Sequence, residues 1–259
     1  MIADINLAKE AAIKAGKIIL RYYKADYQIE QKGYQNPVTT ADKKADETIK
    51  KILMTARPEY GWLSEETKDS SIRLNKRFVW IVDPIDGTKE FINGIPEFVV
   101  SIALVEYGEP IIGVIYNPVK KEIFVAAKNM GSFFNETKIE CTSKEKISEM
   151  TILNSRSELK RGDWNDYIDI FGNMKPVGSV AYKLALTSAG KADVFISLRP
   201  KNEWDICAGN CIVNEAGGKL VDLRGNKRKY NLDNTLIDFG IIAGDSIAVS
   251  KILPVVKTK

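Results

Sequence analysis

The chain contains no histidine in its 259 residues. This absence excludes serine–histidine and cysteine–histidine catalysis and removes the commonest side-chain ligand of transition metals. If the protein is an enzyme, its chemistry must use carboxylates, hydroxyls, lysines or a metal ion bound through oxygen.

Cysteine is scarce and unpaired. Cys141, Cys207 and Cys211 make an odd number, and their spacing fits neither a disulfide framework nor a zinc site. Cys207 and Cys211 are four residues apart and would share one face of a helix. We expect the three cysteines to be buried structural thiols.

Long apolar runs and a strong charge imbalance are also absent. No apolar stretch approaches membrane-spanning length, and residues 1–4 lack the layout of a signal peptide. We therefore expect a cytoplasmic protein without a membrane partner. The net charge is only +4, and the densest basic run, residues 224–229, is interpreted as a solvated turn, so no nucleic-acid polymer is expected as a partner.

The spacing of apolar residues predicts two kinds of segment. Helices are expected over residues 4–24, 41–56, 179–189, 203–216 and 246–253. Strands are expected over residues 61–64, 78–82, 98–106, 111–116, 122–127, 151–154, 175–177, 192–197, 219–222 and 240–243. Residues 28–37 are expected to be irregular, and their polar content would allow a mobile lid.

The order of these segments predicts a mixed α+β and α/β fold in two parts. Residues 1–150 would form an α+β half with an antiparallel meander, and residues 151–259 an α/β half that completes the site.

The most informative stretch is residues 82–92. Asp83 and Asp86 follow the apolar strand at residues 78–82, Gly87 can adopt conformations closed to other residues, and Thr88 can begin a helix. Two carboxylates at such a corner suit a hard divalent cation, and a helix start suits a phosphate. An ordinary turn explains the same residues, because Asp-Pro and Asp-Gly pairs are common in turns.

Acidic residues also stand at the ends of other predicted segments, namely Asp42, Glu65, Glu66 and Asp205. Each alone is explained by helix capping or by solvent exposure. Their shared position at segment ends favours a common metal site, because loops on a rigid scaffold bring functional groups together.

The chain resembles the inositol monophosphatase superfamily of metal-dependent, lithium-sensitive phosphatases over nearly its whole length. The resemblance rests on four motifs in the same order as in the family, namely residues 37–42, 63–66, 83–88 and 204–218. It implies the layered αβαβα sandwich of the sugar phosphatases, commonly dimeric, so a homodimer is expected.

The resemblance also implies roles for individual residues. Two or three Mg²⁺ ions per site would be bound by carboxylates and one carbonyl, and a Thr–Asp pair would orient the attacking water. The implied metal ligands are Glu65, Asp83, the carbonyl of Ile85, Asp86 and Asp205; the implied catalytic residues are Asp42, Glu65 and Thr88; the implied substrate contacts are Gly87, Thr88, Gly178, Ser179 and Lys183.

The resemblance extends to one branch of the superfamily. Lys89-Glu90-Phe91 resembles the branch that hydrolyses 3′(2′),5′-bisphosphate nucleotides, and Leu198 stands where inositol phosphatases often have a glutamate. Lys183, Arg199 or Lys201 would pair with a second phosphate. The predicted substrate is therefore 3′-phosphoadenosine 5′-phosphate.

Two alternatives remain open from the sequence. The first is an inositol-1-monophosphatase. The second is a regulatory or binding module that keeps the fold without catalysis, although such a module would be expected to lack one of the acids or the Thr88–Asp42 pair, and none is missing.

Overall fold

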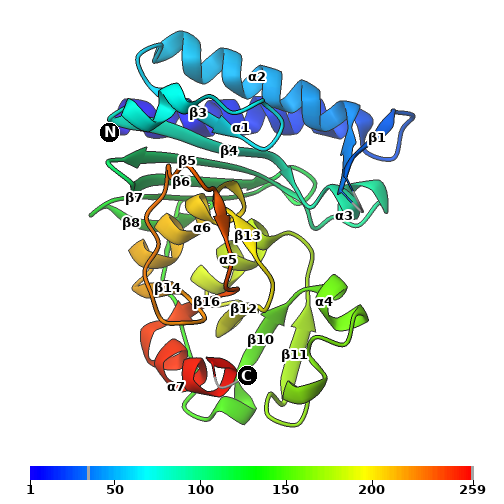
Figure 1. Cartoon of the computed structure of the whole chain (residues 1–259), viewed down its shortest axis with the longest axis vertical. Coiled ribbons are helices and arrows are strands. Elements are labelled where there is room, and N and C mark those ends of the chain that lie inside the picture. The colour runs from blue at the N-terminus through cyan, green and yellow to red at the C-terminus, as the bar shows by residue number, and fades with distance from the viewer. Residues whose placement is uncertain (34–35, 258–259) are drawn as a thin grey trace.

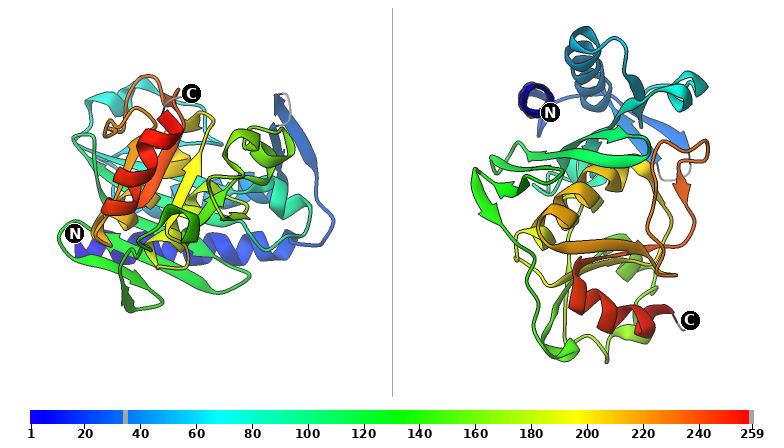
Figure 2. Two further views of the ribbon diagram at one scale, coloured as in Figure 1. Left: turned by 90° about the horizontal axis from the view of Figure 1, so that it is seen from below. Right: turned by 90° about the vertical axis from the view of Figure 1, so that its left-hand side faces the viewer.

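The chain folds into five layers of helices and sheets, which pack against one another through three apolar cores. The computed structural model describes residues 1–33 and 36–257. From one outer layer to the other, the order is a helix pair, a seven-stranded sheet, a second helix pair, a five-stranded sheet and a last helix (Figure 1). This is the αβαβα sandwich that the sequence predicts. Seen edge-on in Figure 2, the first and last helices of the chain lie in opposite outer layers.

The first core lies between the N-terminal helices and the seven-stranded sheet. Helix α1 (Ile2–Tyr22) and helix α2 (Thr40–Ala56) cross one face of this sheet. The buried side of α1 consists mainly of alanines, among them Ala8, Ala12 and Ala15, which let the helix approach its neighbours closely. The predicted start of α1 at residue 4 and its end at residue 24 each differ by two residues from the structure.

The seven-stranded sheet contains the meander. Its strands are hydrogen-bonded in the order of the chain and include two that the sequence analysis did not separate, β8 and β9. The strands are β3 (Gly61–Ser64), β4 (Phe78–Asp86), β5 (Val99–Glu106), β6 (Glu109–Asn117), β7 (Glu122–Ala127), β8 (Gly131–Phe134) and β9 (Thr137–Ile139). All neighbours are antiparallel except β3 and β4, which are parallel. Between these two parallel strands, the chain returns from the end of β3 to the start of β4 through a segment that contains the short helix η1 (Ser71–Asn75).

The second core contains helices α5 (Val180–Ser188) and α6 (Glu203–Glu215), which lie between the two sheets. Helix α6 approaches the seven-stranded sheet most closely at Gly113 on β6. A Cβ atom at this position would lie 2.4 Å from the carbonyl oxygen of Ala208. Only glycine permits this helix-to-sheet distance. Cys207 and Cys211 are buried on α6 as predicted, whereas Cys141 is only partly buried.

The third core lies between the five-stranded sheet and helix α7 (Ser246–Lys257). This sheet has the order β11-β10-β12-β16-β14, with parallel pairing around β10 and antiparallel pairing around β16. Its strands are β10 (Thr151–Asn154), β11 (Asn173–Pro176), β12 (Val194–Ser197), β14 (Gly218–Asp222) and β16 (Ile241–Asp245). The short segments α4 (Arg156–Lys160), η2 (Ile147–Glu149) and η3 (Asn165–Tyr167) connect the strands around it.

Three local predictions differ from the structure. The described part of residues 28–37 is not irregular, because β1 (Ile29–Gly33) pairs with β2 (Asn36–Thr39) in an antiparallel ribbon. The possible lid at 28–37 stays a prediction, and residues 34 and 35 lie outside the described residues. Strand β4 continues to Asp86 instead of ending at residue 82. A further short pair, β13 (Lys201–Asn202) with β15 (Leu236–Ile237), was not predicted.

Among the described residues, no helix is both long enough and apolar enough to span a bilayer.

Candidate active site

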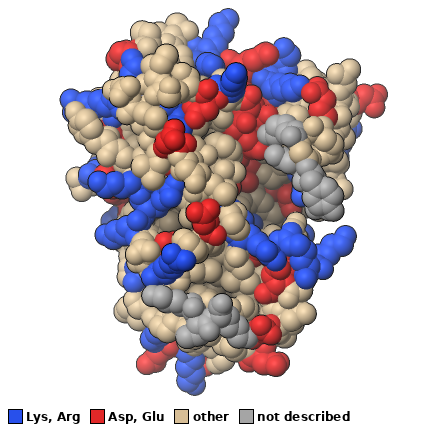
Figure 3. Space-filling view, viewed as in Figure 1, with Lys and Arg blue, Asp and Glu red and all other residues tan. Residues whose placement is uncertain are grey.

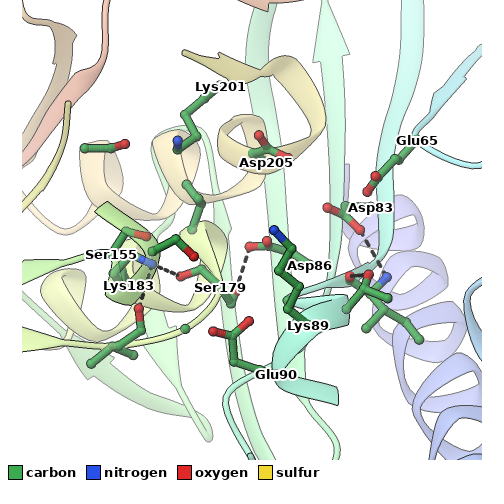
Figure 4. Close-up of a pocket in the computed structure, with 18 of the residues that line it drawn as sticks. Glu65, Asp83, Asp86, Lys89, Glu90, Ser155, Ser179, Lys183, Lys201 and Asp205 are labelled. Carbon is green, nitrogen blue, oxygen red and sulfur yellow. Dashed lines mark hydrogen bonds between the residues drawn. The ribbon is translucent and has the colours of Figure 1, made fainter. Parts of the chain in front are cut away.

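A single pocket brings together the acids that lie far apart in the sequence. Its cavity has a volume of about 280 Å³ and lies between the end of β4, the first turn of α6 and the loop before α5 (Figure 4). The predicted site residues that line it are Glu65, Asp83, Ile85, Asp86, Gly87, Thr88, Gly178, Ser179, Lys183 and Asp205. Asp42 lies behind Thr88 and hydrogen bonds to it. Glu66 does not line the cavity.

The local structure of β3 and β4 explains why three of these acids meet. The two strands are parallel, with Ser64 beside Val82, so Glu65 and Asp83 follow at the same edge of the sheet. The pairing of β4 with β5 is irregular between Asp83 and Asp86. In a regular strand, residues three apart point to opposite faces, so this irregularity lets both aspartates line one pocket.

Asp83, Asp86 and Asp205 form a cluster of buried negative charge. Each offers one carboxylate oxygen, and these oxygens all lie within 4.8 Å of one another. Burial, together with the negative charges of Asp86 and Glu65, raises the pKa of Asp205 to about 8. Burial and the neighbouring acids also raise the pKa of Asp83. Like charges this close are unfavourable without a cation.

This set of donors fits a hard divalent cation. The ligand atoms are carboxylate oxygens, with no nitrogen or sulfur in the cluster. Mg²⁺ prefers oxygen ligands, and the protein usually supplies only some of them because the ion retains several waters. The mutual repulsion of the carboxylates is the free energy that such an ion would relieve when it binds.

Asp86 is oriented by the beginning of α5. Its Oδ2 accepts hydrogen bonds from the Ser179 hydroxyl at 2.6 Å and from the backbone N–H of Ala181 at 2.5 Å. Ser179 has a φ of +57°, which is unfavourable for a residue with a side chain. The sequence analysis expected Ser179 to contact substrate and did not foresee that it orients Asp86.

Thr88 and Asp42 form the predicted hydroxyl–carboxylate pair. Thr88 Oγ1 lies 3.0 Å from Asp42 Oδ1 and 3.1 Å from the carbonyl oxygen of Ile85. Asp42 Oδ2 accepts a hydrogen bond from the backbone N–H of Thr39 in the capping box that begins α2. Burial raises the pKa of Asp42, whereas its bonds to Thr39 and Thr88 lower it in part.

Gly87 makes the turn between β4 and helix α3 (Thr88–Ile92) possible. Its φ is +103°, and a Cβ atom there would lie 3.0 Å from the carbonyl oxygen of Glu97. Both the backbone conformation and the available space therefore require glycine. The turn places Thr88 directly after the aspartates.

The three predicted cationic residues occupy different positions. Lys183 is buried at the pocket, and its Nζ donates to the carbonyl oxygens of Val177 and Ser179 at 2.9 and 2.6 Å. Burial lowers the pKa of Lys183 to about 8, against the opposing charges of Asp86 and Glu90. Lys201 also lines the pocket, whereas Arg199 pairs with Asp163 and does not line it.

Sequence reasoning missed a second group of charges beside the pocket. Glu97 accepts a hydrogen bond from the backbone N–H of Gly178 at 2.7 Å, and Arg156 forms an ion pair with it at 2.5 Å. Glu90 lines the pocket beside Gly178, and the same Arg156 lies 3.7 Å from it. Glu90 was noticed only as part of a motif. Nothing in the spacing of Arg156 and Glu97 predicts their contact.

The layered sandwich and the carboxylate pocket together define a metal-dependent phosphatase of the sugar-phosphatase type. A model described as the inositol monophosphatase family matches residues 3–256. The chain therefore belongs to the inositol monophosphatase family. It is an enzyme of this metal-dependent phosphatase family.

Relatives and solved structures agree with this assignment. The chain is 34% identical to an inositol-1-monophosphatase of Rhizobium meliloti over 86% of each sequence. It superimposes on the extragenic suppressor protein SuhB of Bartonella henselae with a TM-score of 0.86 and 32% identity, covering 99% of both chains. It also matches CysQ of Bacteroides thetaiotaomicron, a bacterial member of the family, with a TM-score of 0.76 and 32% identity over 93% of this chain and 96% of that one.

Proposed function

We propose that the protein is a Mg²⁺-dependent, lithium-sensitive phosphomonoesterase that hydrolyses 3′(2′),5′-bisphosphate nucleotides, with 3′-phosphoadenosine 5′-phosphate converted to AMP and phosphate. The observation that supports the reaction is the meeting of Asp83, Asp86 and Asp205 beside Thr88 in one cavity. This arrangement joins a site for cations to a hydroxyl that can align water.

Separate groups of residues would bind the metal ions and align the attacking water. Glu65, Asp83, Asp86, Asp205 and the carbonyl of Ile85 would hold two or three Mg²⁺ ions. Bound Mg²⁺ would lower the pKa of a water molecule and offset the charge of the phosphoryl oxygens.

Thr88 is placed to align the attacking water. When its hydroxyl donates to Asp42, a lone pair of Oγ1 remains to accept a proton from water. As the proton of the water passes to Oγ1, Thr88 would give its own proton to Asp42, whose buried position and raised pKa favour protonation. Backbone N–H groups of Gly87 and Thr88 would contact the phosphate, as the family resemblance implies.

The choice of substrate depends on the pocket wall. Lys89 and Lys201 line the cavity, so they are placed to pair with a second phosphate. Leu198 packs against the third core and does not line the cavity, so it offers nothing to the hydroxyls of an inositol ring. Both observations favour a bisphosphate nucleotide.

Inositol 1-phosphate is the second candidate substrate. The observation that favours it is the name of the R. meliloti relative, an inositol-1-monophosphatase 34% identical to this chain. A module without catalysis is not favoured, because the acids and the Thr88–Asp42 pair are all present. A homodimer and a cytoplasmic location remain part of the proposal.

A comparison of kcat/KM on 3′-phosphoadenosine 5′-phosphate and inositol 1-phosphate tests the substrate. We expect the nucleotide to be preferred by at least tenfold, as one charge-assisted contact would give. A preference for inositol 1-phosphate would replace the nucleotide with the second candidate. Turnover of neither substrate with Mg²⁺ would contradict the proposed activity.

A further inference from the structure

A second cavity lies on the far side of α6 from the catalytic pocket, and basic residues surround it. Its volume is about 680 Å³, against about 280 Å³ for the catalytic pocket. It lies between α6, β14 and the segment that follows β14. Four of the residues lining it are cationic, namely Lys219, Lys227, Arg228 and Lys229, and one, Glu109, is acidic.

The position of the basic run is fixed at both ends. Asp222 Oδ1 accepts hydrogen bonds from the backbone N–H groups of Arg224 and Asn226 at 2.9 and 2.8 Å. At the other end, Tyr230 is buried and its backbone N–H donates to the carbonyl oxygen of Gly108. The cations between these anchors therefore stand on a defined segment. Figure 3 shows basic side chains gathered on the left of the molecule, where the segment between β14 and β15 runs in Figure 1.

The charges of this run are only partly balanced. Arg228 forms an ion pair with Glu203 at 3.3 Å, and Lys219 donates to the Ser250 hydroxyl. Among the described part of the chain, no acidic side chain forms an ion pair with Lys227 or Lys229. Four cations around one cavity raise its potential, so a bound anion would lower the electrostatic free energy.

A buried polar group at the same cavity supplies an independent observation. The Asn210 side chain is only 5% exposed and lines the cavity from α6. Its Nδ2 donates to the Tyr230 hydroxyl at 2.8 Å, whereas its Oδ1 has no hydrogen-bond partner in the described structure. Oxygen and nitrogen of an amide can exchange places by a flip, in which case the unpartnered end is a donor. A buried polar atom without a partner is costly, and a polar group bound at this cavity would supply the missing partner.

We propose that this cavity is a second binding site for a small molecule bearing a di- or polyphosphate, distinct from the catalytic pocket. Lys227, Lys229 and Lys219 would contact phosphate oxygens, and the Asn210 amide would bond to the ligand at the cavity floor. The size of the cavity admits more than an inorganic ion, so the phosphates would belong to a molecule such as a nucleoside diphosphate. Arg228 remains engaged with the buried Glu203.

Calorimetric titration of the metal-free protein in a chelator tests this site. The probes are inorganic phosphate, pyrophosphate and ADP, at low ionic strength. Metal-free protein is used because the carboxylates of the catalytic pocket, without cations to neutralise them, repel anions from that pocket. We expect pyrophosphate and ADP to bind with a stoichiometry of one, and ADP more tightly. The double variant K227A/K229A should bind both at least about tenfold more weakly.

Two further variants make the comparison specific. K227R/K229R keeps both charges and should retain binding, and K17A/K51A removes two exposed lysines from α1 and α2 and should also retain it. Equal binding by K227A/K229A and the wild type would overturn the proposal, as would the absence of pyrophosphate binding at millimolar concentration. Much tighter binding of a single-stranded oligonucleotide than of ADP would replace the small molecule with a nucleic acid.

Discussion

Thr88 Oγ1 and Asp42 Oδ1 lie 3.0 Å apart although 46 positions separate them in the sequence. The capping box at the start of α2 fixes the carboxylate, and the Gly87 turn at the end of β4 fixes the hydroxyl. Two unrelated local structures therefore hold this hydroxyl and this carboxylate together. The pair lies next to Ile85 and the aspartates of β4, which is the position that the proposed mechanism requires.

Replacement of Thr88 by valine should remove catalysis while it preserves the site's shape. Valine is nearly isosteric but cannot align water or donate to Asp42, so we expect kcat to fall roughly 10²-fold or more. Thr88→Ser keeps the hydroxyl and should retain most of kcat. Steady-state kinetics at saturating Mg²⁺ measures both, and similar kcat values for the two variants would show that the hydroxyl has no role.

Asp83→Asn should abolish turnover and yet stabilise the metal-free protein. The substitution removes a proposed metal ligand, and it replaces a buried carboxyl, whose ionisation the neighbouring acids disfavour, with an amide that cannot ionise. We expect a higher Tm than the wild type in a chelator and a smaller rise in Tm on addition of Mg²⁺. A lower Tm in the chelator would mean that Asp83 does not contribute repulsion.

The stability of the metal-free protein should depend on pH in a defined direction. Asp205 has a folded-state pKa of about 8, above that of an exposed aspartate. Stability from its protonated form is fully present below pH ~4 and is lost as pH rises through about 8. The Tm in a chelator should therefore fall between pH 5 and pH 8, and Mg²⁺ should raise it most at pH 8.

Asp205→Asn serves as the control for this pH dependence. Asparagine does not titrate, so the variant should show a shallower fall of Tm between pH 5 and pH 8. If the wild type and the variant have the same pH profile in a chelator, the raised pKa of Asp205 is not the cause.

Lys89 and Lys201 should matter more for a bisphosphate than for a monophosphate. Each lines the pocket, so Lys89→Ala and Lys201→Ala should each lower kcat/KM for 3′-phosphoadenosine 5′-phosphate by about tenfold. The effect on inositol 1-phosphate should be smaller. Arg199→Ala is the matched control, because Arg199 pairs with Asp163 outside the pocket. Equal losses of kcat/KM on both substrates would show that these lysines do not determine the choice of substrate.

The sequence predicted which acids lie close together where those acids stand at segment ends. Asp83, Asp86 and Asp205 were expected together because each stands at an element boundary, and the structure places their oxygens within 4.8 Å of one another. Strands β3 to β7 of the first sheet were also predictable, since turn residues separate their apolar runs, whereas β8 and β9 were not predicted.

Other features depend on contacts that no local pattern contains. The irregular pairing of β4 between Asp83 and Asp86 requires β5 as its partner, so the sequence indicated a strand end at residue 82. Strands β1 and β2 are largely polar, and polar strands give no hydrophobic alternation to detect. The role of Ser179 towards Asp86 spans 93 positions and becomes visible only in three dimensions.

The most direct measurement of the central claim is a crystal structure of the protein with Mn²⁺ in place of Mg²⁺, located by anomalous scattering. The account predicts anomalous peaks inside the pocket, bound by oxygens of Asp83, Asp86 and Asp205. A pocket without a peak at saturating Mn²⁺, or peaks only at other surfaces, would contradict it.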